Sequence, residues 1–247
     1  MIQYSDQESK LFQTRFGRVE LPMSFNDWDE LQAEAAEQQF QFVRLRISNP
    51  KSAEIDHILR ICKKASLLEI LRAYTFKYEP GQFIPMLHGG LSFIPVDVKN
   101  KKVFERLLEE SYEDIPFGNY TPASVLQQFP LSLQYRNLHD YFLDNYTGQD
   151  KNNMAFVIRD MEGTPVGCIT LKVFEDKLYS YYVGIVGKYR NMDVLNKSIN
   201  FLQHLTRRLH LPAGEGSARL SNLYSQRAFE KNNMKCTGYD WIYLLEF

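Results

Sequence analysis

The sequence lacks the features that mark several large classes of protein. It has only 3 cysteines, which lie far apart without a CxxC pair, so neither a disulfide framework nor a zinc site is predicted. No run of about 18 apolar residues could cross a membrane, and the N-terminal segment MIQYSDQESK has no apolar core of a signal peptide. We therefore expect a protein of the reducing cytoplasm that has no membrane partner.

Familiar catalytic motifs are absent as well. The chain has no GxSxG turn of a serine hydrolase, no phosphate-binding loop or GxGxxG pattern after a strand, and no HExxH of a metalloprotease. The formal net charge is −1, with 29 basic and 30 acidic residues, so we expect no nucleic acid partner bound by overall charge. We also expect no metal.

The composition is that of an ordinary globular protein, with 44% hydrophobic and 24% charged residues. At roughly 150 residues per domain, a chain of 247 residues is one large or two small domains. The segment 80–95 is rich in proline and glycine and lacks sustained periodicity, which predicts a connector. We therefore predict a smaller α/β domain over residues 1–95 and a second domain over 96–247.

The first domain alternates predicted strands and helices. Its β-branched and aromatic segments predict strands over 16–21, 40–47 and 67–78. Residues that can cap a helix predict two helices, one from Asn26 or Asp27 to Gln38 and one starting at Ser52.

The second domain begins with helices and continues with a hairpin. Helices are predicted over 102–112, 133–145, 194–209 and 222–231. Strands are predicted over 154–159, 166–174, 178–186, 217–220 and 239–246, the first two joined by a turn at 162–165. In the last strand, Trp241, Tyr243 and Leu245 alternate onto one face.

The junction between strand 178–186 and the helix from Val194 is the most informative part of the chain. On this helix Leu195, Ile199, Leu202 and Leu209 have helical spacing, which predicts one buried face. Residues 188–235 hold nine basic and three acidic side chains. That excess fits either a site for an anionic ligand or solvated helix faces.

The segment Lys188-Tyr189-Arg190, followed by a turn and a helix, resembles the GCN5-related N-acetyltransferases. In that family the turn amides bind the coenzyme A pyrophosphate, because free N–H groups and the positive end of the helix dipole attract phosphate. The segment from Asn222 to Met234 is similar to the family's late motif. The resemblance implies an α/β (α+β) fold with a mixed central sheet.

Other segments resemble a narrower group, the TDP-fucosamine acetyltransferase-like proteins, which acetylate the amine of nucleotide-linked amino sugars. The opening Asp6, Ser9 and Phe12 match that group's Asp-x-x-Ser-x-x-Phe pattern, and segment 138–145 is similar to its Leu-Tyr-x-x-Trp-Ile-x-Asn. On this resemblance residues 1–95 are a vestigial acetyltransferase-like domain.

The chain departs from the family at two places. Asn191, Asp193 and Leu195 stand where the turn has glycines, which restricts positive φ and close approach of the backbone. Phe229 stands where the family has the tyrosine that protonates the departing thiolate. No catalytic residue is therefore assigned. His139 is a candidate base or an ordinary helix histidine, and Tyr224 is left unassigned.

The resemblance implies acetyl-CoA as co-substrate and a small-molecule amine as acceptor, in a monomer or homodimer. The residues that it implies for coenzyme contact are Val183, Ile185, Lys188, Tyr189, Arg190, Asn191, Met192, Asp193, Val194, Asn222, Ser225 and Phe229. Two functions stay open. One is an acyl-CoA-dependent N-acyltransferase, and the other is a catalytically inactive binding or interaction module with the same fold.

Overall fold

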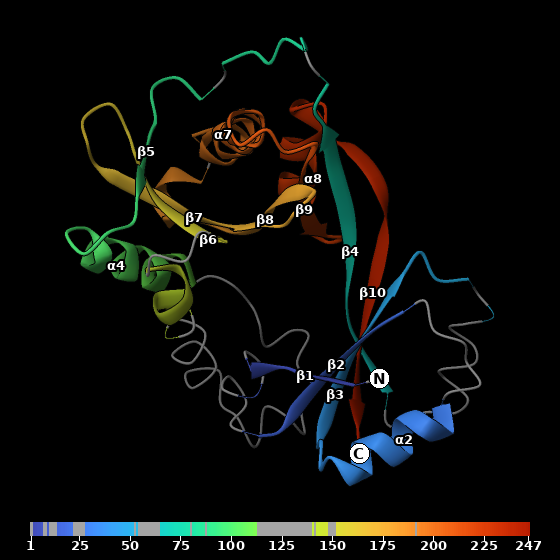
Figure 1. Cartoon of the computed structure of the whole chain (residues 1–247). Coiled ribbons are helices and arrows are strands. Elements are labelled where there is room, and N and C mark those ends of the chain that lie inside the picture. Colours follow the sequence, from blue (N-terminus) through green and yellow to red (C-terminus); the bar gives the residue numbers. More distant parts are fainter. Residues whose placement is uncertain are drawn as a thin grey trace. The chain divides into compact units, whose positions relative to one another are not determined.

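The structure is a computed structural model that divides into two compact units (Figure 1). It describes residues 2–6, 9, 14–21, 28–51, 53, 65–79, 81–86, 88–112, 140, 142–147, 152–190 and 192–247. Unit 1 comprises Met1–Arg72, Pro116–Leu138 and Gly238–Phe247, and unit 2 comprises Ala73–Ile115 and His139–Thr237. Residue 95 lies inside unit 2, and the assignment of 1–95 as a vestigial domain stays a prediction.

Unit 1 is built from strands and one described helix. Its elements are β1 (Gln3–Tyr4), β2 (Phe16–Leu21), α2 (Trp28–Glu37), β3 (Phe42–Ser48), and the first part of β4 (Ala65–Lys77) and last part of β10 (Lys235–Glu246). Strands β2 and β3 are parallel, and β10 runs antiparallel to β3 with Trp241 opposite Ile47. The predicted strands 16–21, 40–47, 67–78 and 239–246 are thereby confirmed, with boundaries shifted by a few residues.

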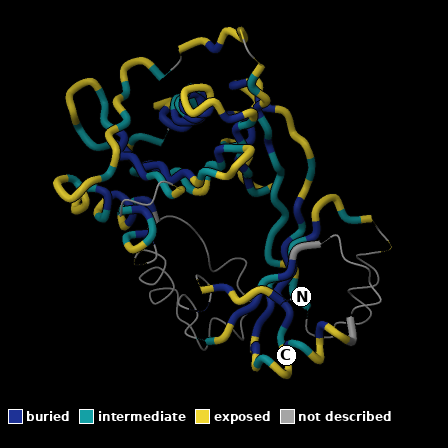
Figure 2. The backbone as a smooth tube through the Cα atoms, in the orientation of Figure 1, coloured by how far each residue is buried: buried dark blue, intermediate teal, exposed yellow. Residues whose placement is uncertain are grey.

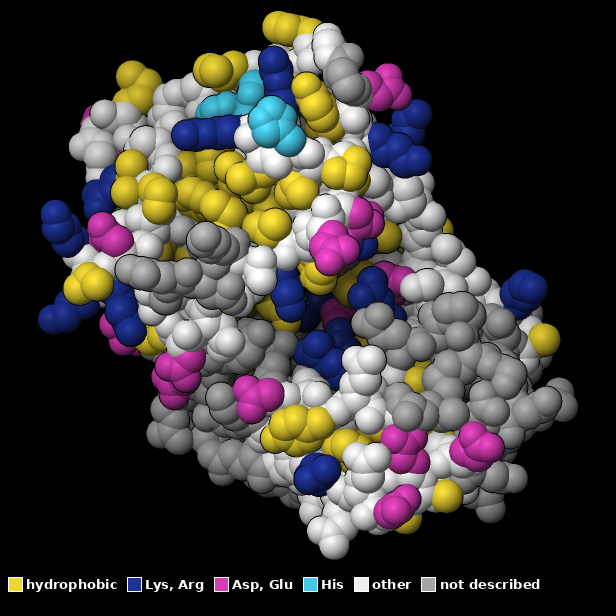
Figure 3. All heavy atoms as spheres, viewed as in Figure 1, with side chains coloured by type: hydrophobic (Ala, Val, Ile, Leu, Met, Phe, Trp, Pro, Cys, Tyr) yellow, Lys and Arg dark blue, Asp and Glu magenta, His cyan; other side chains and the backbone are white. Residues whose placement is uncertain are grey.

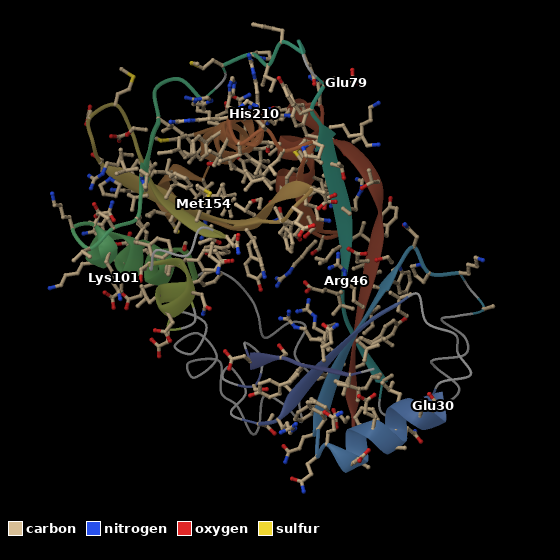
Figure 4. The ribbon with its side chains drawn as sticks, viewed as in Figure 1. Glu30, Arg46, Glu79, Lys101, Met154 and His210 are labelled. Atoms are coloured by element: carbon tan, nitrogen blue, oxygen red, sulfur yellow. The ribbon has the colours of Figure 1, made fainter. Side chains whose placement is uncertain are left out.

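The core of unit 1 lies between α2 and the sheet. Leu31 and Ala35 of α2 pack with Val43 and Leu45 of β3 and with Tyr243 of β10. The predicted alternation of the last strand onto one face is confirmed. At the other end of this strand pair, Arg46 (labelled in Figure 4) donates to Asp240 Oδ2 at 2.5 Å.

Unit 2 contains a mixed sheet with helices on both faces. Its further elements are β5 (Ser92–Pro95), α4 (Lys101–Tyr112), β6 (Asn153–Arg159), β7 (Pro165–Val173), β8 (Lys177–Ile185), the 3-10 turn η3 (Gly187–Tyr189), α7 (Val194–Arg208), β9 (Ala213–Arg219) and α8 (Leu223–Lys231). The strand order is β4-β9-β8-β7-β6-β5. Strands β5 to β8 are antiparallel, which confirms the predicted hairpin, and β8 with β9 is parallel.

Helix α7 packs on one face of this sheet and α4 on the other (Figures 1 and 2). Ile199 and Leu202 of α7 lie in the same buried cluster as Ile169 and Leu178 of the strands. The predicted buried face of the helix is confirmed except at Leu209, which is 38% exposed because the helix has ended there.

Three features differ from the sequence prediction. Segment 80–95 is not only a connector, since β5 pairs with β6 at its end. Strand β9 starts four residues before the predicted Ser217, and β1 was not predicted. The predicted helix from Ser52 and most of segment 133–145 lie outside the described residues, although residues 142–146 are helical.

Candidate functional site

The parallel strands β8 and β9 pair over only part of their length. Within the described chain the ladder runs from Lys177 opposite Ala213 to Ser180 opposite Gly216. Both strands continue, β8 to Ile185 and β9 to Arg219. We call these continuations, Tyr181–Ile185 and Ser217–Arg219, the β8–β9 opening. The predicted parallel pairing of these two strands is confirmed. Helix α7 follows the end of β8 that does not pair with β9.

A β-bulge in β8 starts this opening. Thr170 of β7 lies opposite Tyr182, and Leu171 lies opposite Ser180, so Tyr181 is the extra residue on β8. A bulge bends its strand and increases the local twist. The second half of β8 therefore takes a different direction from the half that pairs with β9.

The turn after β8 is a compact series of backbone hydrogen bonds. The N–H of Tyr189 donates to Val186 O at 2.8 Å, and that of Met192 donates to Tyr189 O at 3.1 Å. The Met192 amide, one of those that we expected to face an anion, is thus already engaged. Asn191 lies outside the described residues.

Asp193 adopts the backbone conformation that the missing glycine would favour. Its φ is 61° and its ψ is 13°, in the left-handed region, which Asp tolerates better than most residues. Its side chain is exposed and makes no capping bond to the helix; Asn196 Nδ2 donates to Asp193 Oδ2 at 3.4 Å. The backbone at residue 193 therefore has a conformation that glycine would favour, but the side chain there is a carboxylate.

Helix α7 begins directly after this residue. Val194 and Leu195 are buried, 3% and 8% exposed, so the first turn is held by the core. The first N–H groups of any helix have no partner within the helix. The start of α7 therefore offers amides and a positive dipole end to an anion.

Arg190 holds the turn to neighbouring elements. Its Nε donates to Ile185 O at 3.2 Å and its Nη2 donates to Ser111 O at 3.4 Å, at the end of α4. Lys188 is exposed, with its Nζ 4.9 Å from the ring centre of Tyr189. Of the two cations at the turn, Lys188 is therefore the one placed to meet a solvent-borne anion.

The start of α8 reaches the same turn through Tyr224. Its hydroxyl donates to Arg190 O at 2.6 Å, and burial together with the charge of Asp193 raises its pKa. Asn222 caps α8, since its Oδ1 accepts from the Ser225 N–H at 3.0 Å. Tyr224 was considered in the sequence but not placed; its position two residues after a capping asparagine is the signal that puts it in the first turn.

Phe229, one turn and a half further along α8, lies in the core. It is 5% exposed and stacks on Tyr74 with ring centres 4.8 Å apart. Its Cζ is 2.8 Å from where a Cβ of residue 216 would stand, so glycine is needed there. The structure does not place Phe229 with the turn residues.

On the face of β8 that meets α4, the hydroxyls of Ser111 and Tyr182 form a hydrogen-bonded pair. Ser111 Oγ donates to Leu108 O at 3.0 Å, so the 2.8 Å bond between Ser111 and Tyr182 has the phenol as donor. Burial raises the pKa of Tyr182, and burial raises that of the nearby Cys168 to about 12. Neither group exchanges a proton with ease near neutral pH.

The structure thus gathers part of the predicted set. The turn after β8 and the start of α7 hold six of these residues: Lys188, Tyr189, Arg190, Met192, Asp193 and Val194. Val183 and Ile185 lie on the strand before the turn. Tyr224, which was not in the predicted set, joins α8 to the turn. Asn222 and Ser225 serve the helix cap. His139 lies outside the described residues.

Most of the basic residues between 188 and 235 lie on solvated faces. Arg207, Arg208, Arg227 and Lys231 are exposed. Histidine side chains gather among lysines and arginines in the upper part of Figure 3. His204 of α7 lies 4.8 Å from His88, ring centre to ring centre, and its Nε2 is 3.2 Å from Pro85 O. His204 therefore holds a loop onto α7.

The described part of the chain lacks two further kinds of feature. No group of His, Cys, Asp and Glu within them could hold a metal ion. No helix among them is long and apolar enough to cross a membrane.

The sequence matches no protein-family model and no curated protein. The structure does resemble solved structures. A functionally unknown conserved protein from Staphylococcus epidermidis has a TM-score of 0.63 at 11% identity, over 98% of this chain and 89% of that one. A GCN5-related N-acetyltransferase from Kribbella flavida has a TM-score of 0.60 at 11% identity, over 94% and 81%. One from Sphaerobacter thermophilus has 0.61 at 10% identity, over 99% and 75%. The chain therefore has the fold of the GCN5-related N-acetyltransferases.

Proposed function

We propose that this protein is an acetyl-CoA-dependent N-acetyltransferase that acts on the amine of a small molecule. The observation that carries the proposal is the continuity of three elements: the β8–β9 opening, the turn from Lys188 to Asp193, and the start of α7. Helix-terminal amides and an exposed lysine are hydrogen-bond donors, and such a set of donors suits the oxygens of a pyrophosphate. The left-handed backbone of Asp193 supports the same proposal, because glycine favours that conformation and the family has glycine in this turn.

The residues present fit the coenzyme in this way. The amides at the start of α7 and the Lys188 ammonium would hold its phosphates, and the backbone edges of the β8–β9 opening would accept its pantetheine arm. When bound, the coenzyme supplies an activated acetyl thioester. The chain's own contribution is orientation, which brings a neutral amine to the acyl carbon and lowers the entropic cost of reaction. The proton of the attacking amine would pass to water, and the thiolate that leaves as the C–S bond breaks would take a proton from water, because no described residue is assigned as base or acid.

The resemblance to TDP-fucosamine acetyltransferase-like proteins supports a nucleotide-linked amino sugar as one acceptor. We also propose a cytoplasmic protein, monomeric or homodimeric. These finer statements rest on the sequence alone.

A second function is favoured by a specific observation. Asp193 carries its carboxylate where an anion would bind, and the Met192 amide is engaged. Phe229, buried on Tyr74, offers no proton. These features support the alternative of an inactive module that keeps the fold for binding or interaction.

Calorimetric titration of the full chain with acetyl-CoA separates the two functions. Saturable binding at one site is the result expected of the transferase. Incubation with acetyl-CoA and a set of primary amines, nucleotide-linked amino sugars included, then identifies the acceptor by mass. Absence of binding, unchanged after Asp193→Gly removes the carboxylate, would defeat the transferase proposal and leave the inactive module as the remaining function.

A further inference from the structure

Asp193 is the residue directly before the first turn of α7, but it does not cap that helix. At this position an aspartate side chain usually accepts hydrogen bonds from the first helical N–H groups. The Asp193 side chain makes no such bond. A capping residue usually has an extended backbone, whereas the φ of Asp193 is 61° and its ψ is 13°. A carboxylate therefore lies at the start of α7 without occupying the helix amides.

Asn196, in the first turn of α7, is the described residue that holds the Asp193 carboxylate. Its Nδ2 donates to Asp193 Oδ2 at 3.4 Å. The Asp193 side chain is exposed, whereas Asn196 is half-buried, so the donor of this bond is the better fixed of the two partners. The carboxylate is thus bonded to a side chain three residues further along the helix, and not to a helix amide.

Asn232, at the end of α8, fixes the direction of the Asn196 amide. It is 3% exposed, and its Nδ2 donates to Asn196 O at 3.0 Å and to Ala228 O at 2.9 Å. Carbonyl oxygens only accept hydrogen bonds, so Asn232 has to present its NH2 group to them. The same NH2 group donates to Asn196 Oδ1 at 2.6 Å. Because Asn196 turns its oxygen to Asn232, its own NH2 group is directed to Asp193.

Asn232 is itself held in one orientation. Its backbone carbonyl accepts from Gln203 Nε2 at 2.6 Å, and Gln203 is also 3% exposed. Its side-chain Oδ1 is buried and has no hydrogen-bond partner among the described residues, which costs free energy. Reversing the amide would set this oxygen against the carbonyl oxygens of Asn196 and Ala228, so the orientation is kept. We call Asn232 and Asn196 the amide pair.

We propose that the amide pair positions the Asp193 carboxylate so that the first amides of α7 stay available to the coenzyme pyrophosphate. Asn196 and Asn232 are then positioning residues, since both act through Asp193. Without its bond to Asn196, the carboxylate is free to turn towards the positive end of the helix, where it competes with phosphate and repels it. The amide pair thereby explains how aspartate can stand where the family has glycine. This inference rests on the proposed function.

The test is a double-mutant cycle in which the full chain is titrated with acetyl-CoA by calorimetry. Asn196→Ala should weaken binding about threefold to tenfold, because a hydrogen bond to a carboxylate is lost. The matched control is the same substitution in an Asp193→Gly background, where no carboxylate needs positioning. There it should change binding by less than about twofold. Asn232→Ala should weaken binding in the same direction and also lose its effect in the Asp193→Gly background. Inorganic pyrophosphate is the second probe.

Two results would overturn the inference. Equal weakening by Asn196→Ala in both backgrounds, or no weakening in either, would show that its effect does not pass through the Asp193 carboxylate. If Asn232→Ala unfolds, the half-buried Asn196 still decides. Acetyl-CoA binding without the dependence on Asp193 defeats this inference alone. Pyrophosphate binding that shows the dependence, without acetyl-CoA binding, defeats only the transferase proposal, and a native protein that binds neither probe defeats both.

Discussion

The ring of Phe229 lies nearly parallel to that of Tyr74, with 4.8 Å between centres and 14° between planes. The Tyr74 hydroxyl lies 3.3 Å from Glu230 Oε1, on the same helix as Phe229. The stack joins β4 to α8 in the core of unit 2. Phe229, which the sequence resemblance predicts at the position of the family's acid, is thus a packing residue.

Phe229→Tyr is expected to lower the free energy of unfolding by about 1–3 kcal/mol, because an added hydroxyl at Cζ enters packed space beside Gly216. Urea unfolding measures it. Phe83→Tyr, at a side chain that is 83% exposed, should stay within about 0.5 kcal/mol. A Phe229→Tyr variant as stable as the native protein and faster in acetyl transfer would show that the phenol has room to reach a leaving group.

Arg190→Ala should lower stability by about 1–2 kcal/mol, since two carbonyl oxygens lose a charged donor. Lys188→Ala should leave stability within about 0.5 kcal/mol, because Lys188 is exposed. Both should weaken acetyl-CoA binding, Arg190→Ala through the shape of the turn and Lys188→Ala through charge. Thermal unfolding and calorimetry on the same samples separate the two effects. Equal stability of both variants would contradict the anchoring role of Arg190.

Three substitutions at Asp193 separate its backbone from its charge. Asp193→Gly should raise stability by about 0.5–1 kcal/mol, because φ is 61° there, whereas Asp193→Ala should lower it by about 1 kcal/mol. Asp193→Asn tolerates the same φ without the charge. Acetyl-CoA affinity should therefore rise in both Asn and Gly variants. If calorimetry finds a rise in the Gly variant alone, close approach of the backbone, not repulsion, limits binding.

Thr170→Val should leave stability unchanged or raise it by up to about 1 kcal/mol. Thr170 is fully buried, and its Oγ1 has no hydrogen-bond partner among the described residues. Removing this hydroxyl from water therefore costs free energy that no hydrogen bond offsets. The matched control is Thr206→Val, equally buried, whose Oγ1 donates to Leu202 O at 2.8 Å. That variant should lose about 0.5–1.5 kcal/mol. The reverse order in urea unfolding would mean that Thr170 is satisfied.

Thiol alkylation at pH 8.5 or so should modify Cys236 and spare Cys168 in the native protein. Cys236 is exposed, whereas Cys168 is buried and burial raises its pKa to about 12, so its reactive thiolate is scarce below that pH. Peptide mapping by mass spectrometry assigns the modified residue, and urea should make Cys168 reactive. Rapid native labelling of Cys168 would show that the α4 face of β7 opens to solvent.

Local pattern in the sequence was sufficient for most elements of the fold. The helical spacing of Leu195, Ile199 and Leu202 predicted the buried face of α7, and the turn at 162–165 predicted the β6–β7 hairpin. These signals are local because a helix or a tight hairpin depends on neighbours within a few residues. The turn from Lys188 to Asp193 was located for the same reason, as a junction between a strand and an amphipathic helix.

Only the tertiary structure decided which strands pair and in which direction the side chains point. Strand β9 contains Gly214 and Gly216, which weaken a β signal, yet both are required because Thr206 and Phe229 occupy the space of a Cβ. Arg190 turns to Ile185 O and Ser111 O, the second 79 residues away in the chain. The sequence alone determined which residues could form the turn, because that depends on local propensity. Which of them are engaged by the protein itself depends on contacts between distant segments, and these exist only in the folded chain.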